Sequence, residues 1–250
     1  MTPTELYIHI PFCIKKCNYC DFLSAVFPER IQEGYALSLC EEIKFLAKLH
    51  PNIELTTIYF GGGTPSWLKE DLMDLILSTI YKNFKVNTLA EVSVECNPGT
   101  LSSEKLNLYR SIGINRLSIG LQSANDDELK DLGRIHDYNR FLHTYDLVRK
   151  AGFDNVNIDI MTGLPYQTID KLEHTINSVT LLRPEHISAY SLIIEEGTPF
   201  YDKYKFDAVK QRAGMPTEDG LPSDEETYKL YKYTINALAS KGYNRYEISN

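Results

Sequence analysis

Residues 6–22 read LYIHIPFCIKKCNYCDF, an apolar, strand-like run that leads straight into three closely spaced cysteines. Cys13, Cys17 and Cys20 form a Cys-x3-Cys-x2-Cys triplet. Three thiolates with this spacing can bind three irons of one cubic iron–sulfur cluster and leave the fourth iron open to a small molecule, whereas ferredoxin-type carriers close every iron with four cysteines. The stretch therefore predicts a strand followed by a loop that holds a cluster with chemistry at its open iron.

The triplet alone also fits two other kinds of site. With His9 nearby, three cysteines could form a structural zinc site, and Cys17-x-x-Cys20 is typical of a zinc knuckle. Disulfides are the second alternative, although five cysteines is an odd number for a secreted framework. Cys40 lies in a helical pattern outside the triplet, and we predict that it is a small buried hydrophobe.

Short β-rich runs alternate with longer amphipathic runs along the whole chain. Six strands are predicted at Leu6–Ile10, Thr56–Phe60, Glu91–Glu95, Arg116–Ile119, Asn155–Met161 and His186–Ile193. Helical patterns follow at Ile31–Leu49, Glu70–Phe84, Ser103–Ile112, Tyr138–Lys150, Ile169–Leu182 and Asp224–Lys241, the last with a capping-box start. This alternation predicts an α/β fold with a parallel sheet and the helices outside. Six units fit an incomplete, TIM-like (βα)6 barrel better than a closed barrel of eight units.

Two stretches depart from the alternation. Glu195–Pro222 is predicted to be irregular, as a surface lid or a loose connection. Tyr243–Asn250 looks like a strand just completed, and no helix or polar tail follows it. We therefore expect residues 1–250 to be a core domain cut from a longer protein.

Composition excludes some classes of protein. The chain of 250 residues is 43% hydrophobic and 24% charged, as is ordinary for a globular protein. Its net charge of −8 argues against nucleic-acid binding, which needs clustered Lys and Arg. No stretch approaches the length of an apolar membrane span, and the N-terminus lacks the regions of a signal peptide. These features predict a cytoplasmic protein, and a reducing cytoplasm suits thiolate ligands.

Unusual residue clusters fall where the predicted strands end, which is the edge that carries the active site in parallel β/α folds. Taken singly, each cluster also has a structural explanation, such as a tight turn, a solvated charge or an ion pair. Arg134, which could bind a carboxylate, and Asp159, an acid inside an apolar strand, are the clearest charged candidates. Five such clusters on one edge favour a ligand site, and they are Cys13–Cys20, Gly61–Pro65, Glu95–Pro98, Gly120–Ser123 with Gly133 and Arg134, and Asn157–Pro165.

Together these motifs resemble the radical S-adenosylmethionine superfamily. The resemblance is carried by the triplet with Tyr19 before its last cysteine, and by Gly61–Pro65. The strings at residues 6–13, 118–123 and 157–159 are similar to the branch that holds oxygen-independent coproporphyrinogen III oxidase and the haem chaperones. The likeness covers residues 5–250.

The resemblance implies a [4Fe–4S] cluster on Cys13, Cys17 and Cys20, with S-adenosylmethionine at its open iron and a low-potential electron donor. It assigns no catalytic residue. In the oxidase two S-adenosylmethionine molecules bind near the cluster. The matching positions here are Tyr7, Gly62 and Glu95 for the first molecule, and Tyr19, Gly63, Thr64, Gln122, Arg134 and Asp159 for the second, with Ile193 as a weaker match.

Two departures favour the haem-chaperone branch over the oxidase. The oxidase has a further cysteine two residues after its triplet, where this chain has Phe22, and it has a substantial segment before its first strand, where this chain has only residues 1–5. The resemblance then implies a coproporphyrinogen dehydrogenase-like scaffold without oxidase activity. Such a protein would bind haem as cargo and deliver it to acceptor proteins, in some cases by peripheral contact with a membrane. The oxidase, which decarboxylates coproporphyrinogen III, is the alternative.

The histidines carry no haem motif. In this branch Glu247–Asn250 is normally followed by a His-Asn…Tyr-Trp haem-binding motif and a further domain, so we expect the haem ligand beyond residue 250. His9 belongs to the strand pattern of the family, and it is expected either to be structural or to support a site residue. The other histidines are His50, His136, His143, His174 and His186.

Overall fold

Six strands form one sheet whose order follows the sequence, β1-β2-β3-β4-β5-β6, in a computed structural model that describes residues 2–248. The pairs β1–β2, β2–β3 and β5–β6 are parallel. The strands are β1 (Thr2–Ile10), β2 (Ile53–Gly62), β3 (Lys85–Cys96), β4 (Arg116–Gln122), β5 (Val156–Thr162) and β6 (His186–Ser191). The predicted parallel α/β architecture is thereby confirmed.

Helices separate the strands as the alternation predicted. They are α1 (Glu29–Leu49), α2 (Glu70–Asn83), α3 (Ser103–Ser111), α4 (Asp126–Asp131), α5 (Tyr138–Lys150), α6 (Ile169–Leu181), α7 (Pro199–Arg212) and α8 (Asp224–Ser240), with a 3-10 turn η1 (Pro65–Trp67). The predicted capping box at α8 is confirmed, because Ser223 and Glu226 each bond the other's backbone N–H. Among the described residues, none of the helices is long and apolar enough to cross a membrane.

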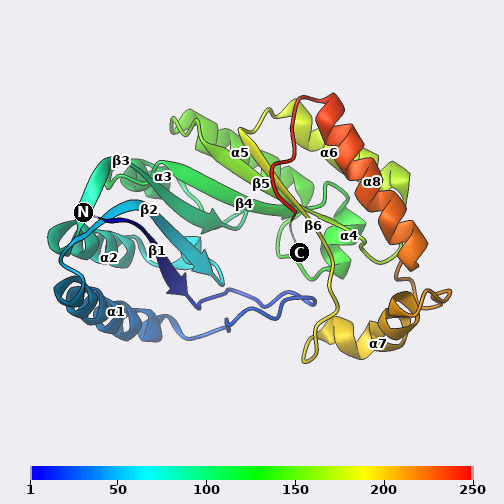
Figure 1. Cartoon of the computed structure of the whole chain (residues 1–250), viewed down its shortest axis with the longest axis horizontal. Coiled ribbons are helices and arrows are strands. Elements are labelled where there is room, and N and C mark those ends of the chain that lie inside the picture. The colour runs from blue at the N-terminus through cyan, green and yellow to red at the C-terminus, as the bar shows by residue number, and fades with distance from the viewer. Residues whose placement is uncertain (1, 249–250) are drawn as a thin grey trace. The chain divides into compact units, whose positions relative to one another are not determined.

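The described chain forms two compact units. Unit 1 comprises residues 2–15, 22–118 and 143–155, and unit 2 comprises residues 16–21, 119–142 and 156–248. In unit 1, α1 and α2 pack against each other (Figure 1). Its core includes Ile10, Phe60, Leu77 and Val94, which are fully buried.

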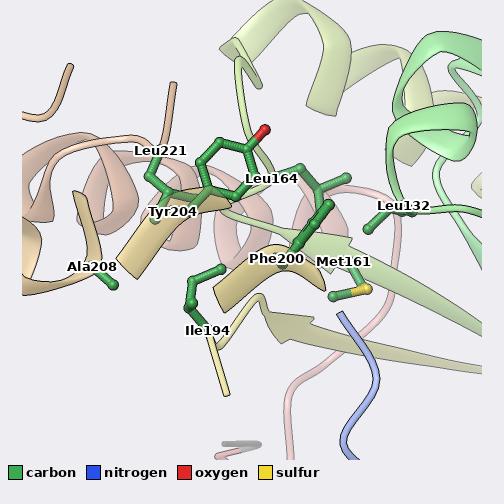
Figure 2. Packing of buried hydrophobic residues seen from close by; sticks show 8 residues of the cluster. All are labelled: Leu132, Met161, Leu164, Ile194, Phe200, Tyr204, Ala208 and Leu221. Atoms are coloured by element: carbon green, nitrogen blue, oxygen red, sulfur yellow. The ribbon is translucent and has the colours of Figure 1, made fainter. Parts of the chain in front are cut away.

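Unit 2 has its own core. In this unit α6 and α8 pack against each other and against β5 (Figure 1). A second group of buried side chains lies where α7 meets the end of β5 and the loops nearby. It consists of Leu132, Met161, Leu164, Ile194, Phe200, Tyr204, Ala208 and Leu221 (Figure 2).

The prediction that Glu195–Pro222 is irregular was wrong, because α7 lies inside it. Thr198 caps this helix by accepting a hydrogen bond from the Tyr201 N–H, and Pro199 occupies the first turn. Phe200, Tyr204 and Ala208, each four residues apart, are buried on one face. Phe206 and Val209 are exposed on the other face, so apolar residues are not confined to one side of the helix and the amphipathic pattern is hard to recognise in the sequence.

The prediction of a strand at Tyr243–Asn250 was also wrong for residues 243–248, which have no strand structure; residues 249–250 lie outside the described residues. Side chains hold this segment instead. The Tyr243 hydroxyl donates to Pro184 O at 2.8 Å, and the Tyr246 hydroxyl lies 2.6 Å from His186 Nε2.

Candidate functional site

Cys13 follows β1 in unit 1 and is held by backbone bonds on both sides. Its N–H donates to Ala25 O at 3.0 Å, and the Ala25 N–H donates to Pro11 O at 3.0 Å. On the other side, the Gly63 N–H bonds Ile10 O and the Thr64 N–H bonds Phe12 O, at 2.9 and 2.8 Å. The sulfur is thus fixed by two neighbouring segments of chain.

The Cys13 sulfur also has a polar neighbour. Thr64, buried at the end of β2, donates its hydroxyl to Cys13 Sγ at 3.7 Å and accepts from Asn97 Nδ2 at 3.0 Å. Gly63 has no room for a side chain, since a Cβ there would lie 2.9 Å from Cys13 Sγ and 2.8 Å from Phe12 O. Thr64 therefore places a hydroxyl donor next to the Cys13 sulfur.

Glu95, at the end of β3, is oriented by two donors in unit 1. The Tyr59 hydroxyl bonds Glu95 Oε1 at 2.8 Å, and the Gly62 N–H bonds Oε2 at 3.2 Å. Gly62 has φ of +119°, and a Cβ on it would lie 2.8 Å from the His9 ring, so both its conformation and its surroundings require glycine. The carboxylate is therefore set in one orientation beside the glycine loop.

Tyr7 and His9, both on β1, are linked in a short chain of hydrogen bonds. His9 Nε2 lies 2.8 Å from Leu23 O, which can only accept, so Nε2 carries the proton and Nδ1 accepts from the Tyr7 hydroxyl at 3.0 Å. Burial, and then the charge of Glu95, raise the pKa of Tyr7. His9 thus fixes the position of the Tyr7 hydroxyl.

Arg134 lies beside Cys17, the second cysteine of the triplet, in unit 2. Its guanidinium donates to Gly120 O at 2.6 Å and to Cys17 Sγ at 3.6 Å. Burial lowers the pKa of Arg134, but the Tyr19 phenol and the Cys17 thiol more than offset this and raise it overall. Burial is also the largest cause of the raised pKa of Tyr19, which keeps this phenol neutral. A permanent cation therefore faces a cysteine sulfur.

The loop of Cys17 and Cys20 is clamped to the segment that carries Arg134. The Asn18 N–H donates to Leu132 O at 2.9 Å, and Asn18 Nδ2 donates to Asp131 O at 2.7 Å. Gly133 has φ of +75°, and a Cβ there would lie 2.9 Å from the Asn18 side chain. Gly133 is thus needed for the close approach of the two segments.

Gln122 and Asp159 are supported by Tyr190 in unit 2. The Tyr190 hydroxyl donates to Gln122 Oε1 at 2.8 Å, and Gln122 has the strained φ of 77° that is common at functional sites. Burial, followed by the charge of Asp159, raises the pKa of Tyr190 well above its usual value. Asn157 Nδ2 donates to Asp159 Oδ1 at 2.6 Å, so the half-buried acid has a neutral hydrogen-bond partner.

His136 is a buried residue close to Arg134, and it is only 5% exposed. Burial, and then the charge of Arg134, lower the pKa of His136 to about 3, so the ring is neutral at physiological pH.

The predicted site residues divide between the two units. Unit 1 holds Tyr7, Cys13, Gly62, Gly63, Thr64 and Glu95, and unit 2 holds Cys17, Tyr19, Cys20, Gln122, Arg134, Asp159 and Ile193. The structure adds Tyr59 and Tyr190, which the sequence did not single out. Tyr59 lies three residues before the end of β2, and Tyr190 lies one residue before the end of β6.

None of the five cysteines is in a disulfide, so the disulfide alternative was wrong. Within residues 2–248, no group of three or more His, Cys, Asp or Glu side chains is arranged to hold a single metal ion. In a cubic cluster each cysteine binds a different iron, and its ligands are therefore more widely spaced than those of one ion. The prediction for Cys40 is confirmed, since it is 3% exposed in α1.

Comparison with known proteins places this arrangement in a family. Residues 7–179 match the model of the radical SAM superfamily. The chain is 38% identical to a protein of Bacillus subtilis named heme chaperone HemW over 98% of this chain and 62% of that one. It is 33% identical to a protein of the same name from Escherichia coli, over 100% of this chain and 62% of that one. The chain thus spans 62% of the length of these relatives.

A solved structure supports the fold. Coproporphyrinogen III oxidase (HemN) from Escherichia coli, described as a radical SAM enzyme, superposes with a TM-score of 0.83 at 28% identity over 97% of this chain and 54% of that one. The predicted partial (βα)6 barrel is thereby confirmed.

Proposed function

Because the chain belongs to the radical SAM superfamily, we propose that Cys13, Cys17 and Cys20 hold a [4Fe–4S] cluster with S-adenosylmethionine at its open iron, and that the protein is a haem chaperone. The observation that supports the haem-chaperone part of this proposal is the 33–38% identity, over nearly the whole chain, to proteins named heme chaperone. Haem is the cargo in this proposal, and haem-acceptor proteins and a low-potential electron donor are the partners. The location is cytoplasmic.

The residues present suit such a cluster. None of the three cysteines is in a disulfide, and two of the three sulfurs accept a hydrogen bond, from the Thr64 hydroxyl at Cys13 and from the Arg134 guanidinium at Cys17. Gly63 keeps the space next to Cys13 Sγ clear of any side chain. When bound, the cluster supplies a single electron to the sulfonium of S-adenosylmethionine.

The protein's own contribution is binding and orientation. Glu95, held by Tyr59 and Gly62, offers a fixed carboxylate to a ribose hydroxyl or an ammonium group. Arg134 offers a cation for a carboxylate. We assign Tyr7, Gly62 and Glu95 to one S-adenosylmethionine molecule, and Tyr19, Gly63, Thr64, Gln122, Arg134 and Asp159 to a second, with Ile193 as a further candidate.

Oxygen-independent coproporphyrinogen III oxidase activity is the second candidate, favoured by the TM-score of 0.83 to that enzyme. Against it stands Phe22, whose side chain is 68% exposed at the position where the oxidase is expected to carry a further cysteine.

Anaerobic reconstitution separates the two functions. The cluster-loaded chain is incubated with S-adenosylmethionine, a strong reductant and coproporphyrinogen III, and the products are separated by chromatography. We expect no protoporphyrinogen IX, together with haem binding in a parallel titration. Product formed over many turnovers would make the protein an oxidase and would contradict the haem-chaperone proposal.

A further inference from the structure

Lys105 is a buried lysine in unit 1 that belongs neither to the proposed cluster ligands nor to the proposed S-adenosylmethionine residues. It lies in the first turn of α3, where its backbone N–H donates to the capping hydroxyl of Ser102 at 3.1 Å, and it is only 6% exposed. Burial lowers the pKa of Lys105, and the charge of Glu70 partly offsets that effect. Lysine is almost never buried this deeply unless its ammonium group has partners.

The Lys105 ammonium group holds the turn η1. Its Nζ donates to Ser66 O at 2.9 Å and to Leu68 O at 3.1 Å, and Glu70 Oε1 lies 3.7 Å away. Lysine side chains can bond the last carbonyls of a helical turn in this way. Ser66 and Leu68 are fully buried, so their carbonyl groups depend on donors from the protein. Lys105 therefore fixes the turn that directly follows Gly61–Thr64.

Ser66 also holds Asn97, the residue that follows β3. The Thr100 hydroxyl donates to Asn97 O at 2.7 Å, so the Ser66 hydroxyl, which lies 2.6 Å from Thr100 Oγ1, is the donor to it. The Ser66 oxygen in turn accepts from the Asn97 N–H at 3.2 Å. These three bonds fix the backbone of Asn97 against η1.

Asn97 completes the connection to the Cys13 sulfur. Its Nδ2 donates to Thr64 Oγ1 at 3.0 Å, and the Thr64 hydroxyl donates to Cys13 Sγ at 3.7 Å. A hydroxyl proton rotates to suit its neighbours, and an N–H donor on its oxygen turns it toward the sulfur. Hydrogen bonds to cysteine sulfurs are among the features that set the potential of an iron–sulfur cluster. Lys105 is thus connected, through groups of unit 1 alone, to a proposed cluster ligand.

We propose that Lys105 is a positioning residue that raises the reduction potential of the cluster proposed at Cys13. It holds η1 and Asn97 so that the Thr64 hydroxyl stays on the Cys13 sulfur. Reduction adds negative charge to a cluster, and a hydrogen bond to a ligand sulfur stabilises that charge, so the bond makes reduction easier. This inference rests on the cluster of the proposed function and adds to it a residue that is not a ligand.

The test is an anaerobic reductive titration of the reconstituted protein without S-adenosylmethionine, in which the EPR signal of the reduced cluster is followed. Lys105→Met keeps a long side chain and removes its N–H donors. The equilibrium constant for reduction should fall by roughly threefold to tenfold, a shift of up to about 59 mV to lower potential for a one-electron couple. Lys48→Met, at an exposed position of α1 in the same unit, should leave the potential unchanged.

A double-mutant cycle with Thr64→Val shows whether Lys105 acts through the Thr64 hydroxyl. Thr64→Val should lower the potential at least as much as Lys105→Met does. The double variant should match Thr64→Val alone, because the hydroxyl that Lys105 positions is already gone. Shifts that add in the double variant would mean that Lys105 acts by its charge alone, and they would overturn the inference.

Ser66→Ala keeps the inference testable if Lys105→Met does not fold. It removes one buried hydroxyl, keeps both carbonyl acceptors of Lys105, and should also lower the potential. A wild-type potential in Lys105→Met or in Ser66→Ala, at full cluster iron, would overturn this inference and leave the proposed cluster standing. Failure of the wild-type protein to take up a cluster would instead overturn the cluster proposal, and this inference with it.

Discussion

At the scale of single residues, a substitution of Gly63 tests how tightly the chain packs around the proposed cluster loop. In Gly63→Ala the added methyl would lie 2.8 Å from Phe12 O and 2.9 Å from Cys13 Sγ, so backbone or sulfur must move. Overpacking of this kind costs about 1–3 kcal/mol. We expect a lower free energy of unfolding in denaturant and a lower iron content after reconstitution.

Gly34→Ala is the matched control for Gly63→Ala. Gly34 is exposed in α1, and a Cβ there meets nothing within 4 Å. Alanine should stabilise this helix by up to about 1 kcal/mol and leave the iron content unchanged. Equal stability and equal iron in Gly63→Ala and the wild type would show that the glycine is not needed for space.

Arg134 is expected to contribute to S-adenosylmethionine binding through the planar arrangement of its guanidinium N–H groups as well as through its charge. Arg134→Lys keeps the charge, but an ammonium group cannot bond Gly120 O and Cys17 Sγ in the same geometry. S-adenosylmethionine affinity measured by calorimetry should fall by roughly tenfold or more. Arg212→Lys, at the exposed end of α7, is the control, and equal affinity in both variants would remove Arg134 from the site.

Sequence reasoning found proposed site residues that are charged or belong to a motif, and it missed two tyrosines within strands. Glu95 and Asp159 stand out because a carboxylate at the end of an apolar strand, or inside one, is costly to bury. Tyr59 and Tyr190 do not stand out, since aromatic residues are common in ordinary strands as well. Their roles depend on which neighbour lies across the sheet, and that register cannot be predicted from one strand's own residues.

At the scale of elements, α7 and the loop after it are joined by one buried carboxylate. Asp207, which is fully buried, accepts from the N–H groups of Glu218, Asp219 and Leu221 at 2.8, 2.7 and 3.3 Å. The sequence predicted a loose segment here because its glycines and prolines are visible, whereas a side chain that caps three distant N–H groups is not. The prediction was wrong because tertiary contacts order this segment, and local sequence propensity does not reveal such contacts.

Asp207→Asn should therefore loosen this loop. Burial raises the pKa of Asp207, but the three backbone N–H groups more than offset this and hold it below the ordinary value of 3.8. The carboxylate thus stabilises the fold above about pH 4, and this contribution is lost as the pH falls through the lower, folded-state pKa. At pH 7 the variant should lose about 1–3 kcal/mol of unfolding free energy.

The measurement for Asp207→Asn is denaturant unfolding between pH 3 and pH 7. The deficit of the variant relative to the wild type should begin to shrink at the acid end, because the unfolded chain, in which this carboxyl has the higher pKa, then binds a proton and is favoured. Asp202→Asn, on the exposed side of the same helix, should show neither effect. A deficit that stays constant with pH would mean that shape, and not charge, holds the loop.

For the molecule as a whole, the proposal divides the five cysteines into cluster ligands and packing residues, and a series of cysteine variants tests that division. Cys17→Ser should abolish the cluster, because only the triplet can supply three thiolates, so iron and acid-labile sulfide should both fall to background after anaerobic reconstitution. Cys40→Ala removes a buried thiol that accepts from the Thr79 hydroxyl at 3.4 Å, and it should keep the full four irons per chain. The serine variant should also lose S-adenosylmethionine binding, since the open iron that anchors the cofactor is gone. Full cluster iron in Cys17→Ser, or loss of iron in a well-folded Cys40→Ala, would show that the proposed ligands are wrong. Either result would remove the basis for proposing radical chemistry on this scaffold.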